Sequence, residues 1–249
     1  MDTAVDAALD GESADVRRLR ADSDDIVDAV VRAAREGHDR VRRLVGLREL
    51  VGVLRQIEPT AVSGTRVIQP AYAYDPEDPG VRLTREARHR GVVTRIITRP
   101  ATVRTHPLLS SIFPETLLGP CFLRSMVVDG RTALVGGPDD LEGNRTSFLT
   151  TLPEVVEGLG DLWSSTVPLC RPILEPGQRP PLTERQLDVA RLLCVGEKDK
   201  AIARLLRLSP RTVEREVSAI LVGLGVGSRT EAVLAMRGRG VNGGGQAGA

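Results

Sequence analysis

The sequence is poor in lysine, cysteine and aromatic residues, and these shortages exclude several classes of protein. Only two lysines occur in 249 residues, Lys198 and Lys200, and neither follows a glycine, so there is no phosphate-binding G-x-x-x-x-G-K loop. The three cysteines lie far apart, and none of the three histidines pairs with Cys, Asp or Glu at a metal-ligand spacing. No apolar run approaches the roughly 20 residues that span a bilayer. We therefore expect no metal, no cofactor and no membrane span.

A length of 249 residues suits two domains, or one domain plus an extension. Hydrophobic residues make up 41% of the sequence and aromatic residues 2%, which predicts a core of Val, Leu and Ala. The net charge is only +1, so any attraction to nucleic acid must come from local charge. An odd number of cysteines without a recognisable signal peptide is typical of a reducing cytosol. We expect a cytoplasmic, nucleoid-associated protein.

Residues 182–237 show the pattern of four short helices, which predicts an all-α domain. Thr183 with Gln186, and Ser228 with Glu231, have the spacing of capping boxes at helix starts. Ser209-Pro210 places a capping hydroxyl and a φ-fixed residue before the third helix. Only residues 207–209 separate this helix from the second, which is the layout of a helix-turn-helix.

The third of these helices has one apolar face and one polar face. At about 100° per residue, the apolar face consists of Val213, Val217, Ile220, Leu221 and Leu224. The opposite face carries Arg211, Arg215 and Ser218, with Glu214 and Glu216 on its flanks. Arginine can bind guanine through two hydrogen bonds, serine can bind a base or a phosphate, and glutamate can accept from cytosine. A solvated polar face is the alternative interpretation.

The segment resembles the LuxR/GerE-type DNA-binding domain over about 55 residues. The matching positions are Leu182, Thr183, Gly196, Lys200, Ile202, Ala203, Leu206, Ser209, Thr212, Val213, Ile220, residues 224–226 and residues 228–233. Four features depart from the family pattern: Lys198 replaces a small capping residue, Glu214 replaces a basic residue, Glu216 replaces His, and Val222-Gly223 replaces a basic pair.

The resemblance implies a sequence-specific transcription regulator that binds double-stranded DNA. The expected base contacts are Arg211, Glu214, Arg215 and Ser218, and the expected phosphate contacts are Lys200, Thr212 and Arg229. Regulators of this kind work as pairs on two half-sites, so we expect a homodimer. RNA polymerase and a small-molecule effector are further candidate partners, and control of a biosynthetic gene cluster is a candidate role.

Residues 1–60 are predicted to form a helical extension. The stretch from Ala14 to Ile57 has helical character, with a break near Gly37. Within it, residues 41–57 carry a broad apolar stripe. This stripe fits two hypotheses, which are packing against the next domain and formation of a dimer interface.

Residues 61–168 alternate between strand and helix patterns, which predicts an α/β domain with part of its sheet parallel. The predicted strands are 65–69, 92–98, 121–128, 132–135 and 146–151, and the predicted helices are 81–90, 107–112 and 153–166. Five prolines within 168–181 predict a stiff linker at 169–181. Residues 238–249 are predicted to be a flexible tail.

Residues 122–137 resemble the HxKxxxxD motif of the phospholipase D superfamily and the hairpin that follows it. Phe122 stands at the position of the nucleophilic His, Arg124 at that of the phosphate-binding Lys, and Asp129 matches the motif Asp. A phenyl ring can neither attack phosphorus nor accept a proton, so the resemblance implies one phospholipase-D-like repeat without catalytic residues, similar to TrmB-like effector domains. Phe122, Arg124 and Asp129 are a candidate effector pocket. The alternative is a hairpin of any α/β domain.

Three other functions are possible interpretations of this pattern. A two-component response regulator needs a lysine late in its receiver domain, but both lysines lie in the predicted helix-turn-helix. A single-repeat phosphodiesterase that completes its site by dimerisation would contain two copies of Phe122 and no motif histidine. A middle domain that only dimerises is the third interpretation.

Overall fold

The computed structural model describes residues 13–238, and these fold into two compact units. The first, here called the sheet unit, comprises the chain up to Pro70 together with Leu83–Arg99 and Leu117–Arg171. The second, the helical unit, comprises Ala71–Arg82, Pro100–Thr116 and the chain from Pro172 onwards. The predicted tail at 238–249 falls outside the described residues except for Gly238.

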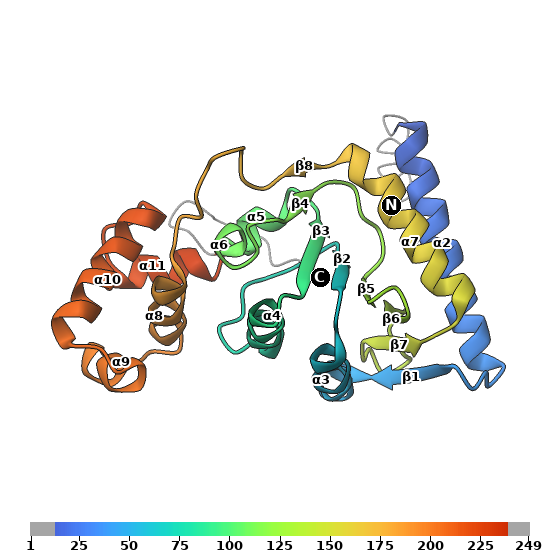
Figure 1. The fold of residues 1–249 in the computed structure, drawn as a ribbon, viewed down its shortest axis with the longest axis horizontal. Coiled ribbons are helices and arrows are strands. Elements are labelled where there is room, and N and C mark those ends of the chain that lie inside the picture. Colours follow the sequence, from blue (N-terminus) through green and yellow to red (C-terminus); the bar gives the residue numbers. More distant parts are fainter. Residues whose placement is uncertain (1–12, 239–249) are drawn as a thin grey trace. The chain divides into compact units, whose positions relative to one another are not determined.

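The sheet unit is built on a mixed β-sheet (Figure 1). Its strands are β1 (Val41–Val45), β2 (Gly64–Gln69), β3 (Val93–Thr98), β4 (Leu117–Leu118), β5 (Ser125–Val128), β6 (Thr132–Gly136) and β7 (Thr146–Thr150). The strand order is β1-β7-β6-β5-β2-β3-β4, followed by β8 (Arg171–Pro172), where the chain passes into the helical unit. β2 pairs with β3 in parallel, and β3 with β4 in parallel, whereas the other pairs from β1 to β2 are antiparallel.

Helices cover both faces of this sheet. They are α2 (Ala14–Arg35), α3 (Gly46–Ile57), α4 (Pro79–His89) and α7 (Pro153–Thr166), with short 3₁₀ turns at Glu58–Thr60 and Val167–Leu169. The larger core lies under α2 and α7, where Val127, Val135 and Phe148 point from the strands. Leu134 and Val128, at alternate positions of the same strands, pack on the other face near α3 and α4. The period of two along each strand therefore divides its apolar residues between two cores.

The apolar stripe at 41–57 is not a continuous helix, so that part of the predicted helical extension is wrong. α2 ends before Gly37, whose φ is 73°, and residues 41–45 form β1, which pairs with β7 in the register Val41↔Thr150. Leu44 of β1 and Val53 of α3 are both buried against Leu134. Most of the stripe therefore belongs to the core of the sheet unit, although Leu47 is 72% exposed.

The other predicted elements of the middle region are present. The strands at 65–69, 92–98, 132–135 and 146–151 and the helices at 81–90 and 153–166 appear as β2, β3, β6, β7, α4 and α7. The strand expected at 121–128 is shorter, since only Ser125–Val128 has strand geometry. The predicted helical turn near 107–112 appears as α6 (Leu109–Ile112), preceded by α5 (Thr102–Thr105). The α/β class of this region is thus confirmed.

The helical unit contains more of the chain than the predicted boundaries 61–168 and 182–237 allow. Its main helices are α8 (Glu184–Cys194), α9 (Asp199–Leu206), α10 (Pro210–Leu224) and α11 (Arg229–Met236). Residues 71–82 and 100–116, which follow the carboxyl ends of β2 and β3, belong to it as well. The backbone N–H of Leu182, just before α8, donates to the Ser111 hydroxyl at 3.1 Å.

Half of the chain's aromatic residues gather in these two inserted segments. The rings of Tyr72 and Tyr74 contact His106 at centroid distances of 4.8 and 5.4 Å, and Phe113 contacts Tyr72. His106 is buried, and its burial lowers its pKa to about 4, so the imidazole is neutral near pH 7. His106 is therefore a packed core residue.

Among residues 13–238, no single helix is long and apolar enough to cross a membrane, while α10 and α11 satisfy length and composition only as a pair bent by 57°.

Candidate nucleic-acid interface

The helices α8 to α11 form the predicted helix-turn-helix, and their ends have the predicted caps. Thr183 and Gln186 form a complete capping box, in which the side-chain oxygen of each residue accepts from the backbone N–H of the other. Arg207 closes α9 in the left-handed conformation with φ 55°, and the Ser209 hydroxyl accepts from the Thr212 N–H at 3.1 Å to start α10. The turn is therefore limited to residues 207–209.

The cap of α11 differs in one detail from the predicted capping box. The Ser228 hydroxyl accepts from the Glu231 N–H at 3.2 Å, as expected. The Glu231 carboxylate, however, accepts from the Gly227 N–H at 2.8 Å, one residue before the N-cap. Two hydrogen bonds, one to the Glu231 carboxylate and one from the Glu231 N–H, therefore hold the turn that leads into α11.

α10 buries its apolar face and exposes the residues predicted to contact bases. Val213 and Ile220 are fully buried, because they pack against the other helices of the unit. The exposed residues of the opposite face are Arg211, Glu214, Arg215 and Ser218. The Ser218 hydroxyl donates to the Glu214 carbonyl oxygen at 3.0 Å, as serines within helices often do.

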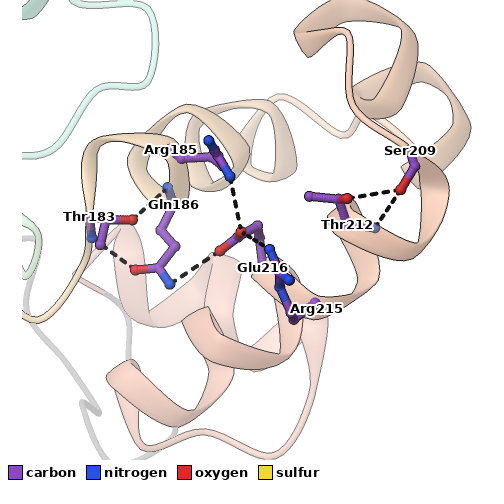
Figure 2. Close-up of polar contacts among 7 residues, drawn as sticks. All are labelled: Thr183, Arg185, Gln186, Ser209, Thr212, Arg215 and Glu216. Carbon is purple, nitrogen blue, oxygen red and sulfur yellow. Dashed lines mark hydrogen bonds and ion pairs between the residues drawn. The ribbon is translucent and has the colours of Figure 1, made fainter.

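Glu216 does not lie on the flank of this exposed face, where the helical pattern placed it. It is only 8% exposed, and its carboxylate is held by residues of two helices (Figure 2). One oxygen accepts from Gln186 Nε2 at 3.3 Å, and the other accepts from Arg215 Nη2 at 3.2 Å. Arg185 Nη1 lies 4.0 Å from that second oxygen. The carboxylate thus lies between two arginines whose side chains remain 71% and 59% exposed.

The sequence pattern assigned neither Arg185 nor Gln186 to this surface. The capping box identified Gln186 as a helix-start residue whose amide oxygen accepts from Thr183 N–H. The amide nitrogen of the same side chain donates to Glu216. Arg185 is one position earlier on α8 and appeared as an ordinary charged residue. Gln186 and Glu216 are 30 residues apart in the sequence. Only the packing of α8 against α10 brings Arg185 and Gln186 to the same surface as Arg215.

The three residues expected at phosphates have different surroundings. Lys200 is exposed on α9. Thr212 lies in the first turn of α10, with its hydroxyl 2.8 Å from that of Ser209 (Figure 2). Arg229 is bound to other residues of the domain, because its guanidinium donates to the Asp199 carboxylate and to the Glu197 carbonyl oxygen. Arg229 therefore ties the start of α11 to the start of α9.

The residues of the candidate effector pocket do not meet in one place. Phe122 and Arg124 precede β5, whereas Asp129 follows it, so Asp129 lies beyond the opposite end of the strand from Phe122. The Asp129 carboxylate accepts from the backbone N–H groups of residues 62, 63 and 64 and from the Ser63 hydroxyl, at 2.8–3.0 Å. Asp129 therefore anchors the turn before β2, and the three-residue pocket is wrong as a single site.

The ring of Phe122 lies close to two arginines. The guanidinium of Arg20 is 4.2 Å from the centroid of its ring, and that of Arg99 is 5.8 Å away. Both distances fall within the range of cation–π interactions. Arg99 also donates through Nε to the Cys121 carbonyl oxygen at 2.9 Å. The position that corresponds to the nucleophile of the resembled motif is therefore filled by a stacked, non-nucleophilic group.

Arg124 contacts Thr146, a residue that lines a groove in the sheet unit. Its Nη2 lies 3.4 Å from the carbonyl oxygen of Thr146. Thr146 lines a groove of about 690 Å³ together with Arg35, Phe148, Asn144 and residues 138–142. Burial and the neighbouring Arg145 lower the pKa of the Arg124 guanidinium. Within residues 13–238, no group of three or more His, Cys, Asp or Glu side chains is arranged to hold a metal ion.

Comparison with known proteins identifies the helical region. The family described as bacterial regulatory proteins, luxR family, matches residues 180–236. No curated protein matches the sequence.

Several solved structures are similar to parts of the chain. NucT from Helicobacter pylori is 10% identical with a TM-score of 0.44, over 53% of this chain and 98% of that chain. The archaeal chromatin protein TrmBL2 is 17% identical with a TM-score of 0.40, over 60% and 63%. VqmA from Vibrio cholerae, described as a LuxR-type receptor, is 18% identical with a TM-score of 0.22, over 42% and 45%. Residues 180–236 therefore form a LuxR-type DNA-binding domain.

Proposed function

We propose that this protein is a sequence-specific transcription regulator in which α10 is the recognition helix. The observation that carries the proposal is the exposed polar face of α10, where Arg211, Glu214, Arg215 and Ser218 lie opposite a fully buried apolar face in a LuxR-type domain. A helix presented in this way fits the major groove, where arginine binds guanine and glutamate accepts from cytosine. Lys200 and Thr212 are the proposed phosphate contacts.

The proposed regulator acts as a homodimer on DNA in the cytoplasm. Residues 182–237 carry ten Lys and Arg against seven Asp and Glu, so one copy has only a small electrostatic attraction to DNA. Two copies on adjacent half-sites would double both the base contacts and the phosphate contacts. RNA polymerase is the proposed partner of the bound dimer, and a biosynthetic gene cluster is its proposed target.

Selection of bound DNA from a random library by the full-length protein tests this proposal. We expect an enriched motif with two symmetric half-sites whose centres are about 10 base pairs, or a multiple of that, apart. Symmetric half-sites would indicate that a dimer binds, and the distance between them would give the separation of its two recognition helices. A library that stays unenriched after repeated rounds at moderate salt would contradict sequence-specific binding. A single unpaired half-site would contradict the dimer alone.

We propose that the sheet unit is non-catalytic and serves as an effector-binding or dimerisation unit. Phe122 supplies no nucleophile, and Asp129 is occupied by the turn at 62–64. The groove lined by Thr146 is large enough for a small molecule, and both apolar and charged side chains line it. We expect no hydrolysis of a chromogenic phosphodiester by the purified protein. Turnover that disappears in an Arg124→Ala variant would refute the non-catalytic assignment.

A further inference from the structure

We propose that Glu216 is a positioning residue that fixes the guanidinium groups of Arg215 and Arg185 side by side for DNA recognition. This inference rests on the proposed function and adds to it a residue that does not itself need to touch DNA. It assigns a role to a position where the resembled family has histidine, and it adds Arg185 of α8 to the recognition surface.

The first step is the geometry around the carboxylate. Glu216 is nearly buried, yet it lies between two arginine side chains that are mostly exposed. A buried carboxylate is stable only when its oxygens are hydrogen-bonded, and here one oxygen faces Arg215 at 3.2 Å and Arg185 at 4.0 Å. The carboxylate therefore binds one guanidinium nitrogen of Arg215 through a hydrogen bond and attracts one of Arg185 as an ion pair, while both side chains stay mostly exposed (Figure 2).

The second step is the rigidity of the carboxylate itself. Its other oxygen accepts from Gln186 Nε2 at 3.3 Å, and the same amide accepts from the Thr183 N–H through Oε1 at 2.8 Å. Both ends of the Gln186 amide are thus used, so the amide cannot rotate without losing a bond. Glu216 is consequently fixed by the N-terminal cap of α8, and through Glu216 the cap restrains Arg215 on α10.

The third step is the consequence for recognition. A free arginine side chain has many rotamers, and ordering it on binding costs affinity. An arginine whose planar group is already oriented loses less of that freedom, and it accepts fewer alternative partners. Glu216 therefore raises discrimination between base pairs. Its negative charge meanwhile lowers the general attraction of this surface to phosphates.

Removal of the Glu216 charge should therefore lower the discrimination between base pairs and raise the general attraction to phosphates, and these two changes can be measured separately. The Glu216→Gln variant of the full-length protein keeps the side chain's size but removes the charge. We expect about a tenfold loss of discrimination at one base pair of each half-site, a value at the lower end for a bidentate contact. Affinity for unrelated DNA is expected to be unchanged or higher, with a steeper dependence on salt. Fluorescence anisotropy with the selected operator, its single-base variants and unrelated DNA measures all three quantities.

Two further variants separate geometry from charge. Glu216→Asp keeps the charge but shortens the side chain, so we expect it to lose discrimination while its affinity for unrelated DNA stays at the wild-type level. Glu184→Gln removes the same charge from an exposed position on α8, and its discrimination should equal that of the wild type. If Glu216→Gln proves unstable in thermal unfolding, Gln186→Ala loosens Glu216 without removing it and should show a smaller loss in the same direction.

Three results would decide against the inference. Wild-type discrimination in both Glu216 variants would show that Arg215 needs no positioning. Equal losses on operator and unrelated DNA would assign Glu216 to folding alone. The same change in Glu184→Gln would assign the effect to net charge. A wild-type protein without any preferred sequence is a different outcome, because it contradicts the proposed function itself.

Discussion

Replacement of Arg215 by alanine is expected to weaken operator binding by about 1–3 kcal/mol and to relax the preference at one base pair of each half-site. The side chain is 71% exposed at the centre of the polar face of α10, and Glu216 holds it by one nitrogen only. Its remaining N–H groups are therefore available to guanine O6 and N7, the bidentate contact that arginine makes most often in the major groove. Competition binding against each single-base variant of the operator gives the energy at every position.

The matched control is Arg204→Ala, which removes the same charge from an exposed position on α9. A phosphate contact carries no sequence information, so any loss in this variant should be equal for all operators and should reduce the salt dependence. If Arg215→Ala behaves in this uniform way instead, Arg215 is a phosphate contact. The base-reading role would then pass to Arg211 or Glu214.

Replacement of Asp129 by asparagine is expected to lower the free energy of unfolding of the sheet unit by about 2 kcal/mol. The carboxylate accepts three backbone hydrogen bonds and one from the Ser63 hydroxyl, and hydrogen bonds to a charged group are worth more than neutral ones. Asparagine tolerates the left-handed backbone at this position, where φ is 52°, so the change isolates the side chain. Its amide nitrogen cannot accept, and part of the turn at 62–64 is left without a partner. Denaturant unfolding at pH 7 measures the loss.

The effect of this substitution should depend on pH. The hydrogen bonds from residues 62–64 hold the pKa of the Asp129 carboxyl well below its usual range. A folded-state pKa below that of the unfolded chain, which is about 3.9, contributes stability that is present above that value and is lost as the pH falls toward the folded-state pKa. The difference between wild type and Asp129→Asn should therefore be full at pH 7 and shrink below about pH 4.

Asp161→Asn, at an exposed position on α7, is the control for a generic loss of one carboxylate. It should change the free energy of unfolding by no more than a few tenths of a kcal/mol at either pH. An Asp129→Asn protein as stable as the wild type would show that the turn before β2 does not depend on this side chain. The assignment of Asp129 to the fold rather than to an effector pocket would then fail.

The DNA-binding domain could be predicted from the sequence because its signals are local. Thr183, Ser209 and Ser228 cap helices through bonds to the residue three positions later, and the apolar face of α10 repeats within one helix. The same reasoning located most strands of the middle region, whose alternation is also a short-range pattern. Such features need no information about which distant segments pack together.

Only the tertiary structure decided the features whose partners lie far away in the chain. Residues 41–45 are a strand because β7, about 100 residues later, supplies their backbone partners, although their apolar pattern also suits a helix. Asp129 binds a turn 65–67 residues earlier because β5 runs antiparallel to β2 and ends beside it. Glu216 is buried because α8 places Gln186 over it, at a position where a single helix seen alone would leave it in solvent. Helical and strand periodicity determine which face of an element a residue occupies, whereas the neighbour that covers that face is determined by how the elements pack.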